Sequence, residues 1–474
     1  MYGLAQRHTT RRQVIAKRST FVGLDVHKES IAVAIAESGR GGEVRTYGQV
    51  GGDLEALDTV RRALQAAGRT LHFVYEAGPC GFTIFRHLTA AGEDCAVVSP
   101  SLIPKRPGDR VKTDRRDAVM LARLHRAGEL RPIYVPNEGD EALRDLVRTR
   151  EDAVTVARDA KQRLKAFVLR HGLRYRGRAG WTLPYRRWLA DLTMPEPAPQ
   201  VALQEYLATV AEAEARVDRL TDQLRALVPL WRWAPVVEAL QALRGVSFIT
   251  ATGLVAEIGD IRRFARAPEL MAYLGLVPSE RSSGPLTRRG RITKAGNSHA
   301  RRLLAEAAWA YRSIPRIGRQ MQQRQEHLPA AIRTLAWTAQ LRLCGRFRRL
   351  NSRGKPRPVI ATAIARELVG FVWAVAKEVP AGAYDDPARS DARAASLSGG
   401  EPSMTLWTSA TADTSVPRAK TFRDALESGG TQPVNISRST IARSRCRACV
   451  GSRGNGTEDD KQRPSGRRVK PILS

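Results

Sequence analysis

The chain has 474 residues, and its 78 Lys and Arg exceed its 47 Asp and Glu, which gives a formal net charge of +31. This length excludes a mini-protein and allows two or three domains with cores of their own. The positive charge implies a polyanionic partner but names no reaction, since a ribosomal or nucleoid-packing protein has the same balance.

Five cysteines in a chain of this length do not form a disulfide framework. Cys446 and Cys449 are the one close pair, and neither a second pair nor a nearby histidine completes a zinc site, which makes zinc the less favoured interpretation. No run of about twenty apolar residues is present, and the basic start is not followed by the apolar segment of a signal peptide. We therefore expect a cytoplasmic, nucleoid-associated protein without a membrane partner.

Residues 1–19 are expected to form a mobile basic arm, and residues 20–137 a domain in which strands and helices alternate. A run of strand-forming residues at 21–24 and the alternation of Ile31, Val33 and Ile35 with small residues predict a hairpin of two strands in Thr20–Ala36. A third strand is expected at 44–50. A helix, a strand, a helix, a strand and a last helix follow, at 53–67, 71–75, 82–91, 95–98 and from Asp114 onward. This order is typical of an α/β domain of the ribonuclease-H-like type.

Four acidic residues lie at the ends of these elements. Asp25 ends the first strand, Glu76 ends the fourth, and Asp114 and Asp117 share one face at the start of the last helix. Four converging carboxylates repel one another unless divalent cations neutralise them, and hard oxygen ligands suit Mg²⁺. Two such ions can activate a nucleophile and stabilise the leaving oxygen of a phosphodiester. The alternative for each acid alone is a helix cap or a surface ion pair with the neighbouring arginines.

Residues 138–230 have helical periodicity. The first seam position recurs every seven residues, at Leu203, Val210, Val217 and Leu224, and the second is predicted at Tyr206, Ala213, Leu220 and Leu227. This pattern indicates a coiled coil or a long helical hairpin. One seam does not say whether the covering helix comes from the same chain or from a second copy.

Residues 231–378 are expected to form a mostly helical domain. In Ala242–Asp260, a glycine turn between two short helices suits either a helix-hairpin-helix that grips a DNA phosphate or an ordinary helical corner. The next segment reads as a flexible basic loop with two hydroxyls, and either these hold a phosphate near a nucleophile or they only make turns. Its chemistry-bearing residues are Ser282, Ser283, Arg288, Arg289, Arg291 and Lys294. Val359–Val375 reads as a buried helix, and residues 379–474 as a disordered tail.

Several stretches together resemble the insertion-sequence one-hundred-and-ten family of transposases, which have an RuvC-like DEDD domain and a C-terminal transposase domain. The acidic stretches are FVGLDVHKESIAVAIAE, VYEAGPCGF and VKTDRRDAVMLARL. The second half contributes LRGVSFITATGLVAEIGDIRRFARAPELMAYLGLVPSERSSG and GRITKAGNSHARRLL, so the resemblance runs in order over roughly residues 20 to 378. Matched residues in two separate regions are more specific than a shared fold.

The resemblance implies a DNA transposase or recombinase that mobilises its own insertion sequence. Ser283 would attack the phosphodiester and form a 5′-phosphoserine, with Ser282 as the adjacent alternative, while Asp25, Glu76, Asp114 and Asp117 with Mg²⁺ position the phosphate. Arg288, Arg289, Arg291 and Lys294 are assigned to nucleic-acid binding by their chemistry. The implied partners are donor and target DNA, a guide (bridge) RNA from the element in some members, and further copies in a dimer or tetramer with composite sites. Basic stretches at Lys105–Lys112 and Arg342–Arg357 would suit such an RNA.

Three other functions fit parts of the sequence. In a structure-specific endonuclease of the Holliday-junction type, the same acids activate water and Ser283 has no role. In a non-catalytic DNA- or RNA-binding protein, the acids have no role in the output. A sugar-kinase-like ATPase also opens on a strand with Asp, but no Gly-rich phosphate loop follows.

Overall fold

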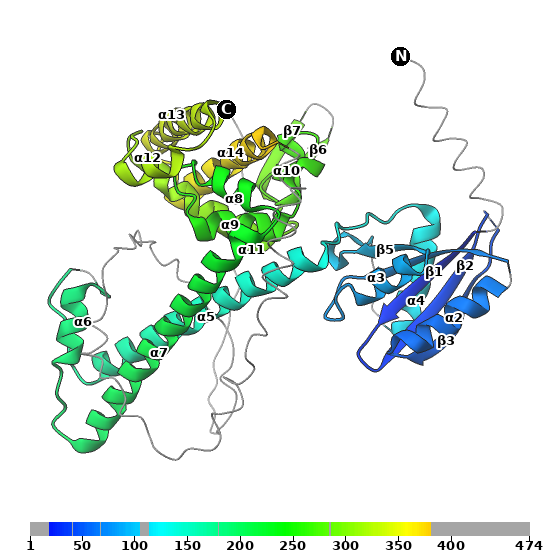
Figure 1. The fold of residues 1–474 in the computed structure, drawn as a ribbon, viewed down its shortest axis with the longest axis horizontal. Helices are drawn as coiled ribbons and strands as arrows, with labels where there is room; N and C mark the ends of the chain where they lie inside the picture. Colours follow the sequence, from blue (N-terminus) through cyan, green and yellow to red (C-terminus); the bar gives the residue numbers. More distant parts are fainter. Residues whose placement is uncertain are drawn as a thin grey trace, which may run out of the picture. The chain divides into compact units, whose positions relative to one another are not determined.

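A mixed five-stranded sheet forms the N-terminal part of the fold in the computed structural model (Figure 1). The structure describes residues 19–380 except 40, 67, 105–112, 179 and 284–285. The strand order is β3-β2-β1-β4-β5; β2 is antiparallel to β1 and β3, whereas β1, β4 and β5 run parallel. The strands are β1 (Ser19–Val26), β2 (Ser30–Glu37), β3 (Val44–Gly51), β4 (Thr70–Glu76) and β5 (Asp94–Val98).

The two faces of this sheet differ in side-chain size. On β2, the large residues Ile31, Val33 and Ile35 alternate with alanines, as the period of a strand requires. The large residues pack with α2 (Leu54–Ala66) and α3 (Thr83–Ala90). The alanines face α4, which spans residues 114–127. The predicted order of three strands followed by helix, strand, helix, strand and helix is confirmed.

A long helical hairpin follows the sheet. Helix α5 (Glu138–Arg170) packs along α7 (Pro197–Leu227), and the short helix α6 (Leu183–Ala190) lies in the connection between them (Figure 1). In the described residues, α7 is covered by α5 of the same chain, as the intramolecular alternative predicted.

The predicted second seam position on α7 is wrong by one residue at three of its four positions, whereas Ala213 is buried as predicted. Leu207 and Thr221 are buried, whereas Leu227 is 44% exposed and Tyr206 and Leu220 are only partly covered. Thr221 is polar, so hydrophobicity did not reveal its place in the interface. Its hydroxyl accepts a hydrogen bond from Arg150 Nε of α5 at 2.7 Å.

The C-terminal part is largely helical, and its core also includes Leu143 and Val147 of α5 and Leu224 of α7. Its helices are α8 (Ala234–Leu240), α9 (Phe248–Ile258), α10 (Ala267–Tyr273), α11 (Ser298–Ala308), α12 (Arg319–Gln325), α13 (Ala330–Ser352) and α14 (Arg357–Glu378). The predicted flexible loop is instead an antiparallel β-hairpin of β6 (Pro278–Ser283) and β7 (Leu286–Ile292). The loop prediction was wrong because both strands are polar and exposed, and they lack the apolar alternation that marks a half-buried strand.

Helix α14 confirms the predicted buried helix. Within the described residues it alone is long and apolar enough to span a membrane by length and composition, with a mean hydropathy of 1.7 over its most apolar stretch. It packs against α8, α10, α11 and α13, and Ile364, Leu368 and Val372 are buried, as in the core helix of a folded domain.

Some predictions fall outside the described residues. These are the basic arm up to residue 18, the basic loop at 105–112, the tail from residue 381 and the Cys446–Cys449 pair. Ser19, which was assigned to the arm, begins β1 and is buried.

Candidate active site

The predicted acids lie at the carboxyl ends of neighbouring strands and at the start of α4. The parallel strands β1 and β4 pair up to Leu24 and Tyr75, so Asp25 and Glu76 come next at the same edge of the sheet. Helix α4 begins at Asp114, with Asp117 also in its first turn, after Thr113 caps it by accepting a hydrogen bond from Arg116 N. Carboxyl ends of parallel strands are where α/β sheets place their reactive groups.

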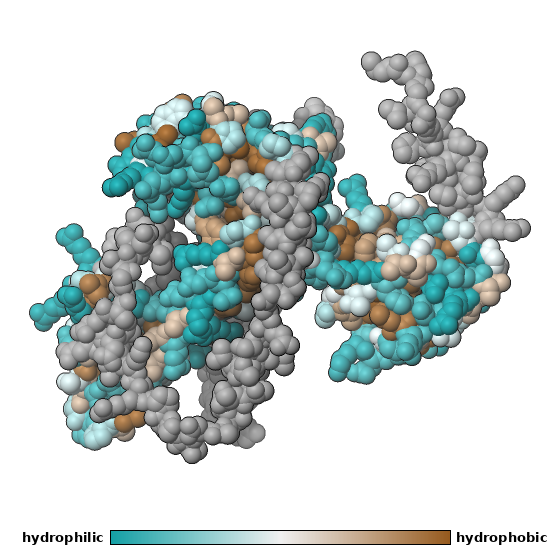
Figure 2. Space-filling model, in the orientation of Figure 1, coloured by the Kyte–Doolittle hydropathy of each residue, from teal (hydrophilic) through white to brown (hydrophobic). Residues whose placement is uncertain are grey.

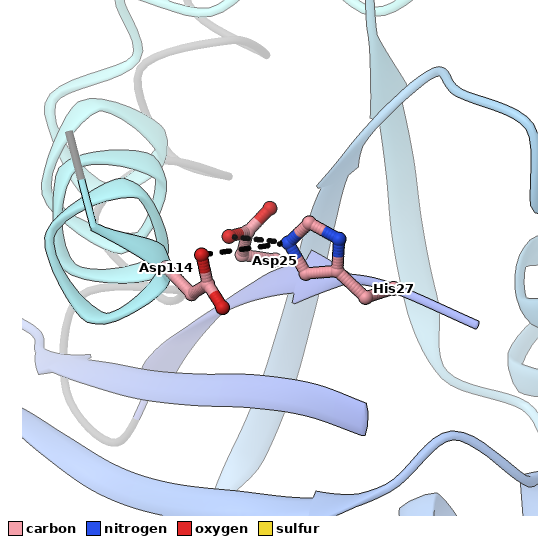
Figure 3. A group of neighbouring side chains, drawn as sticks. All are labelled: Asp25, His27 and Asp114. Carbon is pink, nitrogen blue, oxygen red and sulfur yellow. Dashed lines mark ion pairs between the residues drawn. The ribbon is translucent and has the colours of Figure 1, made fainter. Parts of the chain in front are cut away.

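His27 joins two of these acids. Its Nε2 lies 3.4 Å from Asp25 Oδ2 and 3.6 Å from Asp114 Oδ1, and Figure 3 shows the ring directed at both carboxylates. One ligand atom from each of the three residues lies within 4.8 Å of the others, so these three side chains could hold a metal ion. Glu76 and Asp117 are outside this group.

The surroundings of Asp25 oppose a negative charge there. Burial raises the pKa of the Asp25 carboxyl above its ordinary value; His27 counteracts this shift, whereas the carboxylates of Asp117 and Asp114 add to it. Three acids thus share one electrostatic site, and the region favours a cation.

A glycine in β1 allows α4 to reach this position. A Cβ on Gly23 would stand 2.3 Å from the carbonyl oxygen of Ala118 and 2.5 Å from Ala122 N, far inside contact distance. The alanines of β2 extend this surface of small side chains, on which Ala118 and Ala122 pack. Small residues on this face therefore bring the first turn of α4 to Asp25.

The second predicted site lies on the β6–β7 hairpin, and its two serines have different surroundings. Ser282 Oγ donates a hydrogen bond to Glu280 Oε1 at 2.7 Å, and Glu280 Oε2 lies 3.7 Å from Arg289 Nε of β7. Ser282 therefore belongs to the hairpin face that carries a carboxylate.

Ser283 shares the other face with two guanidinium groups. Arg281 pairs with Arg288 across the hairpin and Ser283 pairs with Leu286, so these four side chains lie on one side. Arg281, Ser283 and Arg288 are exposed. Like charges directly opposite each other on two strands destabilise the pairing, and an anion between them relieves that repulsion.

The remaining predicted cations surround the same hairpin. Arg289 and Arg291 are exposed on β7, and Lys294 follows it with a left-handed backbone (φ 57°). Lys294 N donates to Gly275 O at 3.1 Å, which fixes the end of β7 beside α10.

Two glycines form the base of this hairpin, where its two chain segments cross. A Cβ on Gly275 would stand 2.1 Å from Ala295 O, and one on Gly296 would stand 1.9 Å from Tyr273 O. Both glycines have positive φ, of 64° and 74°. Only glycine permits these backbone contacts.

A buried carboxylate, that of Glu257, connects the end of the β6–β7 hairpin to helix α5. Glu257 of α9 accepts two hydrogen bonds from Arg148 of α5, at 2.8 and 3.0 Å, and one from Asn297 Nδ2 at 2.5 Å. His299 Nδ1 lies 3.3 Å away. Burial alone would raise the pKa of Glu257, but hydrogen bonds from His299, Arg148 and Asn297 outweigh it and hold the pKa well below its usual range. These residues line a cavity of about 500 Å³.

Two weaker predictions also have a place in the structure. Of the two short helices predicted in Ala242–Asp260, α9 lies in that stretch, whereas α8 ends just before it, at Leu240. Ser247 caps α9 by accepting a hydrogen bond from Thr250 N. That this pair of helices binds a DNA phosphate stays a prediction. Within the basic stretch 342–357, Arg342 and Arg346 pair with Glu367 at 2.9 and 2.5 Å, so part of that charge is neutralised within the domain.

The sequence interpretation missed His27, Arg281 and Glu257. His27 follows Asp25 by two residues, which was an available signal, and Arg281 alternates with Ser283. Nothing in the sequence pattern marked Glu257, because it lies in a helix that otherwise reads as apolar core.

Comparisons with known proteins match both parts of the chain. Residues 22–172 match a family profile designated DEDD_Tnp_IS110 and described as "Transposase". Residues 237–324 match a profile described as "Transposase IS116/IS110/IS902 family". The chain is 50% identical over 371 residues to the putative transposase y4qE of Sinorhizobium fredii, covering 77% of this chain and 91% of that one. It is 29% identical over 346 residues to the transposase for insertion sequence element IS1533 of Leptospira borgpetersenii, covering 72% and 99%.

Proposed function

The chain belongs to the IS116/IS110/IS902 family of transposases and acts on DNA, and from this premise we propose that it cuts and rejoins DNA through Ser283, assisted by metal-binding acids. Its substrates in this proposal are the ends of its own insertion sequence and a target DNA. The observation that carries the proposal is the hairpin face on which Ser283 shares its side with Arg281 and Arg288.

The donor set at the sheet edge fits a divalent cation. Asp25 and Asp114 supply carboxylate oxygens and His27 a ring nitrogen, at separations of 3.4 and 3.6 Å. Neighbouring ligands of an octahedral ion with bonds of 2.0–2.1 Å lie about 3 Å apart, so small movements would complete such a site. We propose that these residues hold Mg²⁺, with Glu76 and Asp117 adding ligands or charge. When bound, the ion would polarise the scissile phosphate.

Ser283 is favoured over Ser282 as the nucleophile. The hydroxyl of Ser282 is engaged by Glu280, whose negative charge repels a phosphate. On the Ser283 face, the guanidinium forks of Arg281 and Arg288 attract one, and planar guanidinium groups match phosphate oxygens. Arg289, Arg291 and Lys294 would contact the flanking backbone.

The proposed reaction has two steps, and in each of them one oxygen replaces another on the same phosphorus. The Ser283 oxygen forms a bond to phosphorus while the bond from phosphorus to the 3′-oxygen breaks; the serine loses its proton and the departing 3′-oxygen gains one. In the second step, a 3′-hydroxyl of another strand attacks the phosphorus of the phosphoserine. The bond from phosphorus to the Ser283 oxygen breaks, and the serine regains a proton as the attacking hydroxyl loses one. Arg281 and Arg288 would stabilise the charge that develops on the phosphate oxygens in both steps.

The remaining parts of the proposal rest on the family resemblance. Residues 20–137 would form the RuvC-like domain, residues 138–230 the arm, and residues 231–378 the serine domain. Asp25 and Ser283 would act on one phosphate in a composite site of a homo-oligomer in the cytoplasm, with a guide RNA from the element choosing the DNA.

Covalent trapping tests the serine. Purified protein is incubated with element-end DNA and Mg²⁺, denatured, and examined for a protein–DNA adduct. We expect the adduct in wild type and in Ser282→Ala but not in Ser283→Ala. Loss in Ser282→Ala alone would assign the other hydroxyl. Nicks that form without an adduct and survive Ser283→Ala would instead support the structure-specific endonuclease, in which the acids activate water.

A further inference from the structure

The end of the helical hairpin has a charge distribution unlike the rest of it. Residues 161–190, which we name the arm tip, contain nine Lys and Arg and no Asp or Glu. The flanking helical segments, residues 138–160 and 191–227, which we name the stem, are acidic. The first has four basic and seven acidic residues, and the second has three basic and seven acidic residues. Charges that only keep a surface hydrated are interspersed in sign, whereas here the positive charge is concentrated on a negatively charged stem.

The cations of the arm tip are at its surface. Seven of them are exposed, namely Arg163, Lys165, Arg170, Arg174, Arg176, Arg178 and Arg187. Figure 2 shows hydrophilic side chains standing out from this end of the hairpin, around α6. Surface charges of one sign and this density attract a polyanion over a Debye length of about 8 Å at physiological salt.

A carboxylate of α7 that reaches the arm tip, that of Glu214, is already neutralised. Glu214 accepts two hydrogen bonds from Arg186, both at 2.7 Å, and lies 2.5 Å from Lys161 Nζ. This pairing ties α6 to α5 and α7. The basic surface therefore has a rigid support.

The aromatic residues of the arm tip serve that support. Tyr175, Tyr185 and Trp188 pack on one another with ring centroids 5.1–5.5 Å apart, and Trp181 packs on Tyr185 at 5.5 Å. Lys161 and Arg186 lie over the Trp181 ring at 5.2 and 5.8 Å. A site for single strands offers open rings on which bases stack, whereas these rings are occupied by one another.

We propose that the arm tip is a second DNA-binding surface, which holds the phosphate backbone of duplex DNA without reading its sequence. Exposed arginines without free aromatic rings suit phosphates rather than unpaired bases. The acidic stem repels DNA, so the duplex is held at the tip and not along the arm. The proposal rests on the family's action on DNA and is independent of the serine chemistry.

The test compares two triple variants of the full chain, both with three exposed arginines changed to alanine. One is Arg174→Ala, Arg176→Ala and Arg187→Ala in the arm tip; the matched control is Arg216→Ala, Arg219→Ala and Arg225→Ala on the stem. Affinity for a duplex of arbitrary sequence is measured over a salt series. Three lost phosphate contacts reduce the slope of log affinity against log salt by about 3 in the tip variant. The control keeps the wild-type slope.

Melting temperatures and a second nucleic acid, a hairpin RNA, complete the test. Melting temperatures within about 2 °C of wild type establish that both variants fold, because surface changes alter stability little. A tip variant that binds duplex DNA like wild type overturns the proposal. So does a tip variant that loses affinity for a hairpin RNA while its duplex DNA affinity is unchanged, which would assign the surface to RNA. Covalent trapping with Ser283→Ala is scored separately, so a failure of either proposal is visible by itself.

Discussion

Gly23 of β1 lies against the backbone of Ala118 of α4, so closely that a Cβ on the glycine would stand 2.3 Å from the alanine's carbonyl oxygen. This contact sets how near α4 comes to the sheet. It therefore sets the separation of Asp25, on the strand, from Asp114 and Asp117, in the first turn of the helix.

Replacing Gly23 with alanine should displace α4. Overpacking of this kind typically costs about 1–3 kcal/mol, and the acids move apart with the helix. We expect a lower urea midpoint and weaker divalent-metal binding in Gly23→Ala. Gly41→Ala is the matched control, because a Cβ there meets nothing within 4 Å. Equal stability and metal affinity in the two variants would contradict this account.

His27 should contribute to metal affinity beyond what the acids supply. Loss of a ligand or of its orienting contact costs about tenfold or more in affinity. Because an imidazole ligand favours transition metals over Mg²⁺, His27→Ala should lose more affinity for Mn²⁺ than for Mg²⁺. Titration calorimetry with each ion measures this directly. Lys28→Ala, one residue along and exposed, should bind both ions like wild type. Unchanged Mn²⁺ affinity would limit His27 to pairing with the two carboxylates.

Neutralising Arg288 should separate stability from activity. In Arg288→Gln the repulsion with Arg281 disappears, and the hairpin gains up to about 1 kcal/mol. The same change removes a cation from the Ser283 face and should reduce adduct formation by at least about tenfold. Arg289→Gln, on the face with Glu280, is the control and should lose less activity. If both variants lose activity equally, the two faces of the hairpin do not differ in function.

Glu257 should stabilise the fold in a pH-dependent way. Its pKa is lowered in the folded state, so its contribution is complete above its ordinary value of 4.5 and is lost as pH falls toward the folded pKa. Glu257→Gln leaves Arg148 without its anion, and we expect a loss of about 2–3 kcal/mol at neutral pH, since Arg148 is half exposed and screened. Thermal unfolding from pH 7 to pH 3 should show the two proteins converging.

The control for this experiment is Glu306→Gln, an exposed residue of α11 that pairs with Arg302. It should differ little from wild type over the whole pH range. A constant gap between wild type and Glu257→Gln from pH 7 to pH 3 would show that the carboxylate's charge is not what stabilises this junction.

The ends of strands and helices were predictable because their signals are local. Short runs of strand-forming residues, with alternation on β2, located the strands, and the acids at the ends of β1 and β4 followed from counting along the chain. The close approach of α4 to the sheet was not predictable, since it depends on a contact between Gly23 of β1 and Ala118 of the helix. The place of His27 beside Asp114 depends on that same approach.

Two errors have a common physical cause. Thr221 in the second seam of α7 and the strands of the β6–β7 hairpin are held by polar groups, which hydrophobic patterns do not register. Thr221 is buried because Arg150 satisfies its hydroxyl, and β6 is a strand because its backbone pairs with β7. Their partners lie on other elements, so a single-sequence pattern could not reveal them.

At the base of the β6–β7 hairpin, Gly275 lies against the backbone of Ala295, and Gly296 lies against the backbone of Tyr273. Since those two positions admit no side chain, the crossing geometry stays the same whatever residues follow on the strands. The exposed residues 280–283 of β6 and 288–289 of β7 can thus be exchanged without disturbing this base. Transposases with altered preference for flanking DNA should be obtainable by exchanging these positions among relatives while Ser283 and both glycines are retained.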